Sequence, residues 1–184
     1  KWTKSTSYSR MLTLKRKGFV DFKYSDNCLF KTWTLTQKGF KAISNKLPQL
    51  REEGYLSENI ILGGDSGGCA HILNLAIRLR DKGVALPAGL FMISPFVDLT
   101  ISAPSVSKYK HRDPMVTAYA LQRGADGFRG AIAADDARVS PLFADLTGLP
   151  KILAQVGGEE ILLDDALRLA EYGQAAGVNI NCQV

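Results

Sequence analysis

The chain has 184 residues, 46% of them hydrophobic, and a net charge of +5, which suits one globular domain with a substantial core. It has no run of 18 apolar residues and does not start with the charged-then-apolar layout of a secretory signal, so we expect neither a membrane span nor secretion. Three widely spaced cysteines, Cys28, Cys69 and Cys182, are typical of free thiols in a cytoplasmic protein rather than of a disulfide framework or a zinc site.

The first segment of the chain is strongly basic. Residues 1–50 hold 11 Lys and Arg against 2 Asp and Glu, whereas residues 51–184 hold 12 against 16. A basic segment can bind nucleic acid or an anionic membrane, but here the lysines are scattered singly and form no helical stripe. We therefore expect a solvated segment with neither partner over residues 1–46, and a main domain over residues 47–184. Weak alternation of apolar residues predicts two strands in the basic segment, at 18–22 and 30–35.

From Leu47 onward, helix and strand signals alternate along the chain. A short helix closes at Glu53, before Gly54. Short apolar runs predict buried strands at 59–62, 90–93, 152–156 and 178–184. Helical periodicity predicts helices ending near Lys82, over 117–122 and from about 162 to 175, with polar loops over 94–114 and 123–149. This order predicts an α/β fold with a mostly parallel sheet, helices on both faces, and chemistry at the carboxyl ends of the strands.

A G-x-S-x-G pattern, Gly64 to Gly68, lies between the first of these strands and the helix that follows it. The pattern is typical of a tight turn that strains the serine backbone and presents its hydroxyl at the top of a sheet. Ser66 is therefore the candidate nucleophile, and the N–H of Gly67, at the start of the helix, is a candidate oxyanion donor. The alternative is a glycine-rich turn in which the serine has no catalytic role.

The same letters, G-D-S-G-G, also form the nucleophile signature of chymotrypsin-like proteases. Those proteases are paired β-barrels in which the histidine and the aspartate precede the serine. Here both histidines, His71 and His111, follow Ser66, and a long helix follows the motif. This excludes the protease interpretation. We expect His71 to be a helix-face residue and His111 a solvated loop residue.

Further motifs accompany this turn at regular intervals. Five stretches follow one another in the chain: Glu58–Ser66, Leu90–Leu99, Arg112–Met115, Val139–Phe143 and Val156–Asp165. Together they resemble the bacterial hormone-sensitive-lipase family of α/β-hydrolases, mostly small carboxylesterases, over about residues 51–184. Gly67 stands where that family usually has Ala, and Cys69 where it often has Gly, but both are small enough for the turn.

The resemblance implies a triad in the chain order serine, acid, histidine. An ungapped match to the family's D-x-L-x-D-E pattern puts the acid at Glu160, with Glu159 as the second choice. Asp164 and Asp165 are expected in the first turn of a helix, where the helix dipole favours carboxylates. The family's histidine would fall just past Val184, and its His-Gly-Gly-Gly oxyanion motif would lie upstream. We therefore expect an α/β-hydrolase fold that is incomplete at both ends.

The resemblance predicts a carboxylic-ester hydrolase that acts on small acyl esters through a Ser-His-Glu triad, without a metal or an organic cofactor. Asp98 and the loop 100–115 are candidates for contacts with the substrate. A homodimer of the full-length protein is left open, and the chain alone is expected to be inactive. The alternative is a non-catalytic ligand-binding protein on the same scaffold.

Overall fold

The computed structural model describes residues 20–23, 32–35, 50 and 52–184. The chain divides into two compact units, Lys1–Gly54 and Tyr55–Val184. The division into a basic segment over 1–46 and a main domain over 47–184 stays a prediction. In the first unit, β1 (Val20–Lys23) and β2 (Thr32–Leu35) pair antiparallel, which confirms the two strands that weak alternation predicts. The remaining parts of those two stretches, and Cys28, lie outside the described residues.

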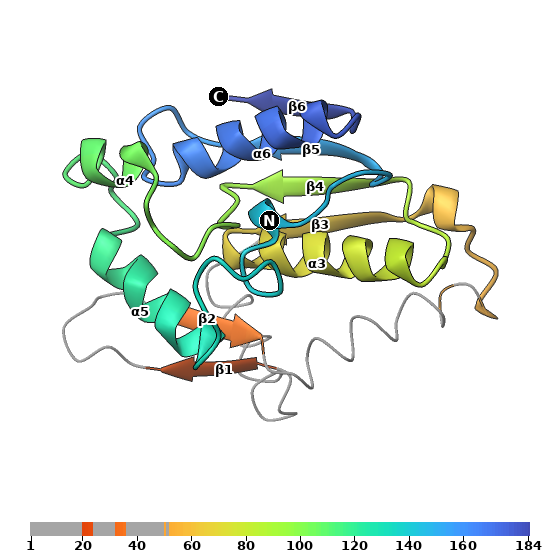
Figure 1. Cartoon of the computed structure of the whole chain (residues 1–184), viewed down its shortest axis with the longest axis horizontal. Helices are drawn as coiled ribbons and strands as arrows, with labels where there is room; N and C mark the ends of the chain where they lie inside the picture. The colour runs from red at the N-terminus through yellow and green to blue at the C-terminus, as the bar shows by residue number, and fades with distance from the viewer. Residues whose placement is uncertain (1–19, 24–31, 36–49, 51) are drawn as a thin grey trace, which may run out of the picture. The chain divides into compact units, whose positions relative to one another are not determined.

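The second unit alternates strands and helices, as Figure 1 shows. Its strands are β3 (Ile61–Asp65), β4 (Gly89–Ile93), β5 (Lys151–Gln155) and β6 (Ile180–Gln183). Its helices are α3 (Gly67–Asp81), α4 (Pro104–Lys108), α5 (Ala118–Arg129) and α6 (Leu163–Ala175), with short 3₁₀ turns η1 (Ser57–Asn59) and η2 (Pro141–Phe143). None of the helices in the described ranges combines the length and the apolar character needed to cross a bilayer.

The four strands of this unit form one parallel sheet in the order β3-β4-β5-β6. Leu90 of β4 lies opposite Leu62 of β3 on one side and Ile152 of β5 on the other. The sheet confirms the predicted α/β fold with a parallel sheet. Parallel strands end at the same edge, so the residues after β3, β4 and β5 come together there.

The main core lies between one face of this sheet and the helices α3 and α6, which are drawn on the same side of it in Figure 1. Met92 and Ala154, paired in neighbouring strands, contribute to this core together with Leu73 of α3 and Leu169 of α6. A second, smaller core gathers side chains from the loops at the carboxyl edge and from α5: Phe96, Leu99, Tyr109, Leu121, Ala125, Val139, Ile161 and Leu162. The sheet with its two covering helices and the loops at its carboxyl edge thus pack as two separate clusters.

Three elements differ from the sequence-based prediction. Strand β3 begins at Ile61 rather than at Asn59, because Asn59 ends the 3₁₀ turn η1. It continues through two glycines to Asp65. Helix α5 runs on to Arg129, although Gly124 and Gly127 obscure its periodicity. The segment 94–114, predicted as a loop, contains α4, whose 5 residues are too few to show a helical repeat in the sequence.

Candidate active site

Ser66 occupies the turn between β3 and α3 with φ 52° and ψ −124°. A positive φ in a residue other than glycine costs on the order of 1–3 kcal/mol and persists only where neighbouring contacts hold it. Here the Ser66 N–H donates to the carbonyl of Ile93 at 2.9 Å. The Ser66 carbonyl accepts from the N–H groups of Cys69 at 3.0 Å and Phe96 at 3.2 Å. The structure therefore shows the strained backbone that the motif predicts for a nucleophile.

Gly64 makes the turn sterically feasible. A Cβ at this position would lie 2.8 Å from the N of Cys69 and 2.8 Å from the carbonyl carbon and oxygen of Gly68. Only glycine therefore lets the strand and the helix approach this closely. A Cβ at Gly67 would meet nothing within 4 Å, so the departure from Ala at that position does not reflect lack of space.

The thiol of Cys69 binds the same Ile93 carbonyl that accepts from the Ser66 N–H. Its Sγ donates to the Ile93 carbonyl at 3.4 Å, and burial raises the pKa of the Cys69 thiol to about 12. A thiol that stays protonated at neutral pH is a poor nucleophile. Cys69 and Cys182 are both free thiols.

Glu160 lies in the loop after β5, at the same edge of the sheet as Ser66. Its Oε1 accepts a hydrogen bond from the Gly157 N–H at 2.8 Å, and a Cβ at Gly157 would lie 2.8 Å from that oxygen. Loss of water contact raises the pKa of the Asp65 carboxyl, and the negative charge of Glu160 raises it further. The Glu160 carboxylate thus acts electrostatically on the residue next to Ser66.

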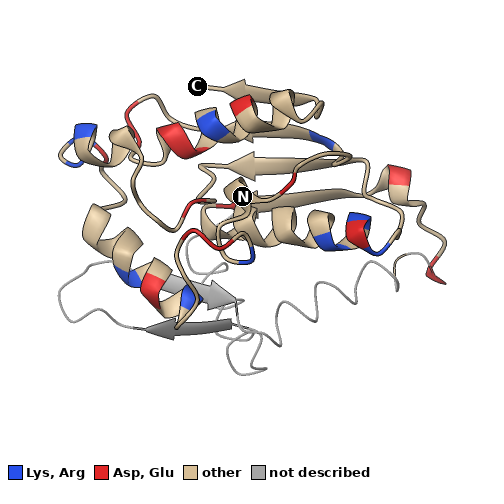
Figure 2. Cartoon of the chain, in the orientation of Figure 1, with Lys and Arg blue, Asp and Glu red and all other residues tan. Residues whose placement is uncertain are grey.

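Glu159 and Glu160 face different surroundings. Glu159 is exposed and forms an ion pair with Arg112 at 2.8 Å, whereas Glu160 is half-buried. Asp164 and Asp165 lie in the first turn of α6, the red turn at the start of that helix in Figure 2. Their predicted position in a helical first turn is confirmed.

Asp98 is 1% exposed, and both of its carboxylate oxygens accept hydrogen bonds from the protein. Oδ2 accepts from Arg168 at 2.7 Å, and Oδ1 accepts from the N–H of Thr100 at 2.8 Å and its hydroxyl at 2.6 Å. These contacts give Asp98 a structural role in fixing the loop after β4. Its predicted contact with the substrate stays a prediction.

The two histidines occupy different environments. The ring of His71 packs edge-to-face on Phe128 of α5, with centroids 5.2 Å apart, and burial lowers the pKa of His71. His111 is exposed in the segment between α4 and α5. Their positions agree with the predicted helix face and surface loop.

Two residues of the segment 100–115, for which the sequence predicts contacts with the substrate, bind the loop that carries Glu160. The carboxylate of Asp113 and the hydroxyl of Ser105 both bind the main chain of Ile161. Asp113 belongs to the Arg112–Met115 motif, which is the signal in the sequence that marked it. Nothing in the sequence distinguishes Ser105 from its neighbouring serines.

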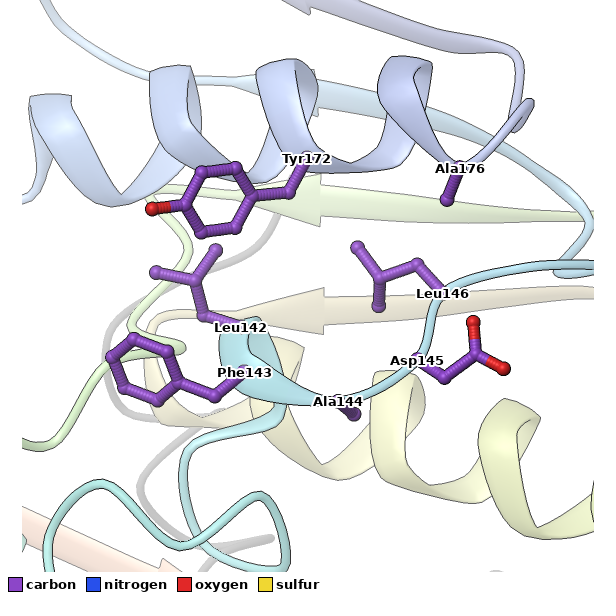
Figure 3. Close-up of a pocket in the computed structure, with 7 residues that line it drawn as sticks. All are labelled: Leu142, Phe143, Ala144, Asp145, Leu146, Tyr172 and Ala176. Carbon is purple, nitrogen blue, oxygen red and sulfur yellow. The ribbon is translucent and has the colours of Figure 1, made fainter.

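Among residues 20–23, 32–35, 50 and 52–184, no group of three or more His, Cys, Asp or Glu side chains is arranged to hold a metal ion. A pocket of about 350 Å³ lies between η2 and α6 (Figure 3). Its lining residues are Leu142, Phe143, Ala144, Asp145, Leu146, Tyr172 and Ala176. It therefore does not include Ser66, Gly67, Asp98 or Glu160.

Comparisons with known proteins give consistent results. A family model described as alpha/beta hydrolase fold matches residues 24–184. A protein of Acinetobacter venetianus named esterase is 39% identical over 141 residues, which are 76% of this chain and 46% of the relative. A Streptomyces hygroscopicus protein named acetyl-hydrolase is 36% identical over 131 residues, which are 71% of this chain and 44% of the relative.

Solved structures that this chain resembles are also described as esterases. The crystal structure of an esterase from the bacterial hormone-sensitive lipase family aligns with a TM-score of 0.77 and 32% identity. That alignment covers 89% of this chain and 53% of the other. The chain thus spans about half the length of the relatives it matches.

Proposed function

This chain belongs to the α/β-hydrolase family, among the bacterial hormone-sensitive-lipase esterases, and we propose that the protein containing it hydrolyses carboxylic esters of small acyl groups. The observation that carries the proposal is the positive φ of Ser66 at a strand-to-helix turn. The name of the Streptomyces relative, an acetyl-hydrolase, supports a small acyl group.

In the proposed reaction, the Ser66 hydroxyl attacks the ester carbonyl and forms a tetrahedral intermediate, which expels the alcohol and leaves an acyl-serine. Water then attacks the acyl-serine and releases the carboxylic acid. The Gly67 N–H would donate to the oxyanion, because the first N–H groups of a helix have no carbonyl partner within the helix. The geometry of α3, which begins at Gly67, supports this role.

The base of the proposed triad is a histidine contributed by sequence outside these 184 residues, as the family resemblance implies. It would take the Ser66 proton and later give it to the leaving alcohol, while Glu160 orients the ring and stabilises the imidazolium. The half-buried position of Glu160 at the Ser66 edge of the sheet supports this role over Glu159, which is paired with Arg112.

The alternative, a non-catalytic binding protein, is less well supported. The positive φ of Ser66 alone does not separate the two functions, since Ser94 has a φ of 44°, but the relatives that this chain matches are named esterase and acetyl-hydrolase, which favours catalysis.

The test is ester turnover by the full-length protein with and without Ser66. Ser66→Ala should lower the hydrolysis of p-nitrophenyl acetate by several powers of ten, to near background. Thr147→Ala, which removes an exposed hydroxyl before the start of β5, at the opposite edge of the sheet from Ser66, is the control and should keep wild-type turnover. Near-normal turnover by Ser66→Ala would show that Ser66 is not the nucleophile.

A further inference from the structure

The peptide group that follows Glu160 is anchored from a distant part of the chain. The Ile161 N–H, which belongs to the Glu160–Ile161 peptide, donates to Asp113 Oδ2 at 3.0 Å. The Ile161 carbonyl accepts from the Ser105 hydroxyl at 2.8 Å. Ile161 itself is 0% exposed. Both polar groups of this buried residue are therefore satisfied by side chains from the segment between β4 and α5.

Asp113 binds Ile161 with one carboxylate oxygen, and its other oxygen binds main-chain N–H groups of the turn that follows Asp113. Oδ1 accepts from the N–H groups of Met115 at 2.9 Å and Val116 at 2.8 Å. Oδ2 remains for the Ile161 N–H. The turn thus fixes the carboxylate before it meets the loop after β5, so the contact does not require ordering of a mobile side chain.

Ser105 is 1% exposed and is locked to α6 by a reciprocal pair of hydrogen bonds. The Ser105 N–H donates to Asp164 Oδ2 at 2.7 Å, and the Asp164 N–H donates to the Ser105 hydroxyl oxygen at 3.2 Å. With its proton directed to the Ile161 carbonyl, the Ser105 hydroxyl acts as donor and acceptor at once.

The loop between β5 and α6 also closes on itself. The Glu160 N–H donates to the Gly157 carbonyl at 3.2 Å, and Glu160 Oε1 accepts from the Gly157 N–H at 2.8 Å. These contacts fix the start of the turn, whereas Asp113 and Ser105 fix its end. Apolar packing also fixes the end of the turn, because Ile161 belongs to the same buried cluster as Tyr109, which lies between Ser105 and Asp113 in the chain.

We propose that Asp113 and Ser105 are positioning residues that hold Glu160 in place to orient the catalytic histidine, an inference that rests on the proposed function. A side chain that orients a catalytic group must be held within about 0.5 Å of its working position. Loss of an anchor at Ile161 lets Glu160 move relative to Ser66, because the anchored peptide is directly attached to the Glu160 Cα.

The test uses Asp113→Asn in the full-length protein. Asparagine keeps one oxygen for the Met115 and Val116 N–H groups but places an NH₂ against the Ile161 N–H, so it removes the anchor without changing the size of the side chain. We expect kcat to fall about tenfold to a hundredfold, the loss typical of a misplaced catalytic group, with KM nearly unchanged. Asp145→Asn is the matched control, because Asp145 closes a similar turn with the Thr147 N–H, and it should keep wild-type kcat.

Ser105→Ala is the second variant, and Ser140→Ala is its control. Ser140 is 0% exposed, and its hydroxyl also bridges two main-chain groups, Leu99 N–H and the Ala134 carbonyl. Both variants delete a buried hydroxyl and should lower the melting temperature similarly. Only Ser105→Ala should lower kcat at temperatures well below melting.

A double-mutant cycle with Glu160→Gln separates positioning from general support of the fold. If Asp113 acts through Glu160, Asp113→Asn should cause no further loss of kcat once Glu160 is replaced. Additive losses of kcat, or wild-type kcat in both Asp113→Asn and Ser105→Ala, would overturn the positioning role alone. Wild-type kcat in Glu160→Gln would overturn this inference together with the acid assigned in the proposed function.

Discussion

The Ser66 N–H donates to the Ile93 carbonyl, 2.9 Å away at the end of the neighbouring strand. An equivalent hydrogen bond links the next pair of strands, where the Ser94 N–H after β4 donates to the Gln155 carbonyl of β5 at 2.7 Å. The parallel ladder therefore continues one residue past β3 and past β4. The sheet itself holds the positive φ of Ser66, and the turn that carries Ser66 is part of the fold rather than a flexible addition to it.

The first prediction concerns the glycines of this turn. Gly64→Ala should strongly lower both the free energy of unfolding and ester turnover, because its methyl group meets main-chain atoms of Gly68 and Cys69 at 2.8 Å. Overpacking of this kind costs about 1–3 kcal/mol. Gly67→Ala should keep both quantities, since its methyl group meets nothing within 4 Å. Urea denaturation and turnover of the two variants check this, and equal stability of both would contradict it.

The second prediction separates the two adjacent glutamates. Glu160→Gln should lower kcat far more than Glu159→Gln, because Glu159 is paired with Arg112 at the surface while Glu160 lies at the Ser66 edge. Steady-state kinetics of the full-length variants at pH 7 provide the measurement. Equal losses, or a larger loss in Glu159→Gln, would move the acid by one position.

The sequence was sufficient to predict the alternation of strands and helices after Leu47, the parallel sheet, the turn at Ser66 and the helical first turn that holds Asp164 and Asp165. These features depend on local patterns, such as apolar runs between glycines, and on a motif whose spacing follows from backbone geometry. The end of β3 was missed because Gly63 and Gly64 have low strand propensity, and pairing with β4 extends the strand over them to Asp65.

The contacts around Glu160 were not predictable from the sequence. Asp113 and Ile161 are 48 residues apart, and Ser105 and Ile161 are 56 residues apart. No local pattern encodes such a pairing, which depends on how α4 and the loop after β5 pack on each other. The burial of Asp98 is similar, because its partner Arg168 comes from α6, 70 residues along the chain.

The third prediction concerns Asp165, whose Oδ2 accepts the N–H groups of Val97 and Asp98. Burial raises the pKa of this carboxyl from 3.8 to about 7, with nearby Asp98 adding to the shift, despite the opposing effect of the hydrogen bonds. The folded state therefore holds this proton more tightly than the unfolded state. The contribution of Asp165 to stability is largest below pH 4 and is lost as the pH rises towards 7.

Asp165→Asn removes this titration while keeping the two hydrogen bonds, because a single oxygen accepts both of them. The variant should gain stability relative to the wild type as the pH rises from 4 to 8. The measurement is the difference in free energy of unfolding between the two proteins at pH 5 and at pH 8. A difference that stays constant between these two pH values would contradict the prediction.

The fourth prediction concerns the 184-residue chain by itself. Without a histidine base beyond Val184, its Ser66 hydroxyl should be a weak nucleophile, and turnover should be close to background. Losing one triad member leaves at best roughly 10³–10⁴-fold over water. Brisk ester hydrolysis by the 184-residue chain would show that His71 or His111 serves as the base.

The most direct test of the account is to locate the reactive serine in the full-length protein. The protein is treated with a fluorophosphonate probe, digested, and mapped by mass spectrometry. The account predicts rapid formation of one adduct, on Ser66, and its loss in Ser66→Ala. Retention of ester hydrolysis with an adduct on another residue, or with no adduct on Ser66, would contradict the assignment of Ser66 as the nucleophile.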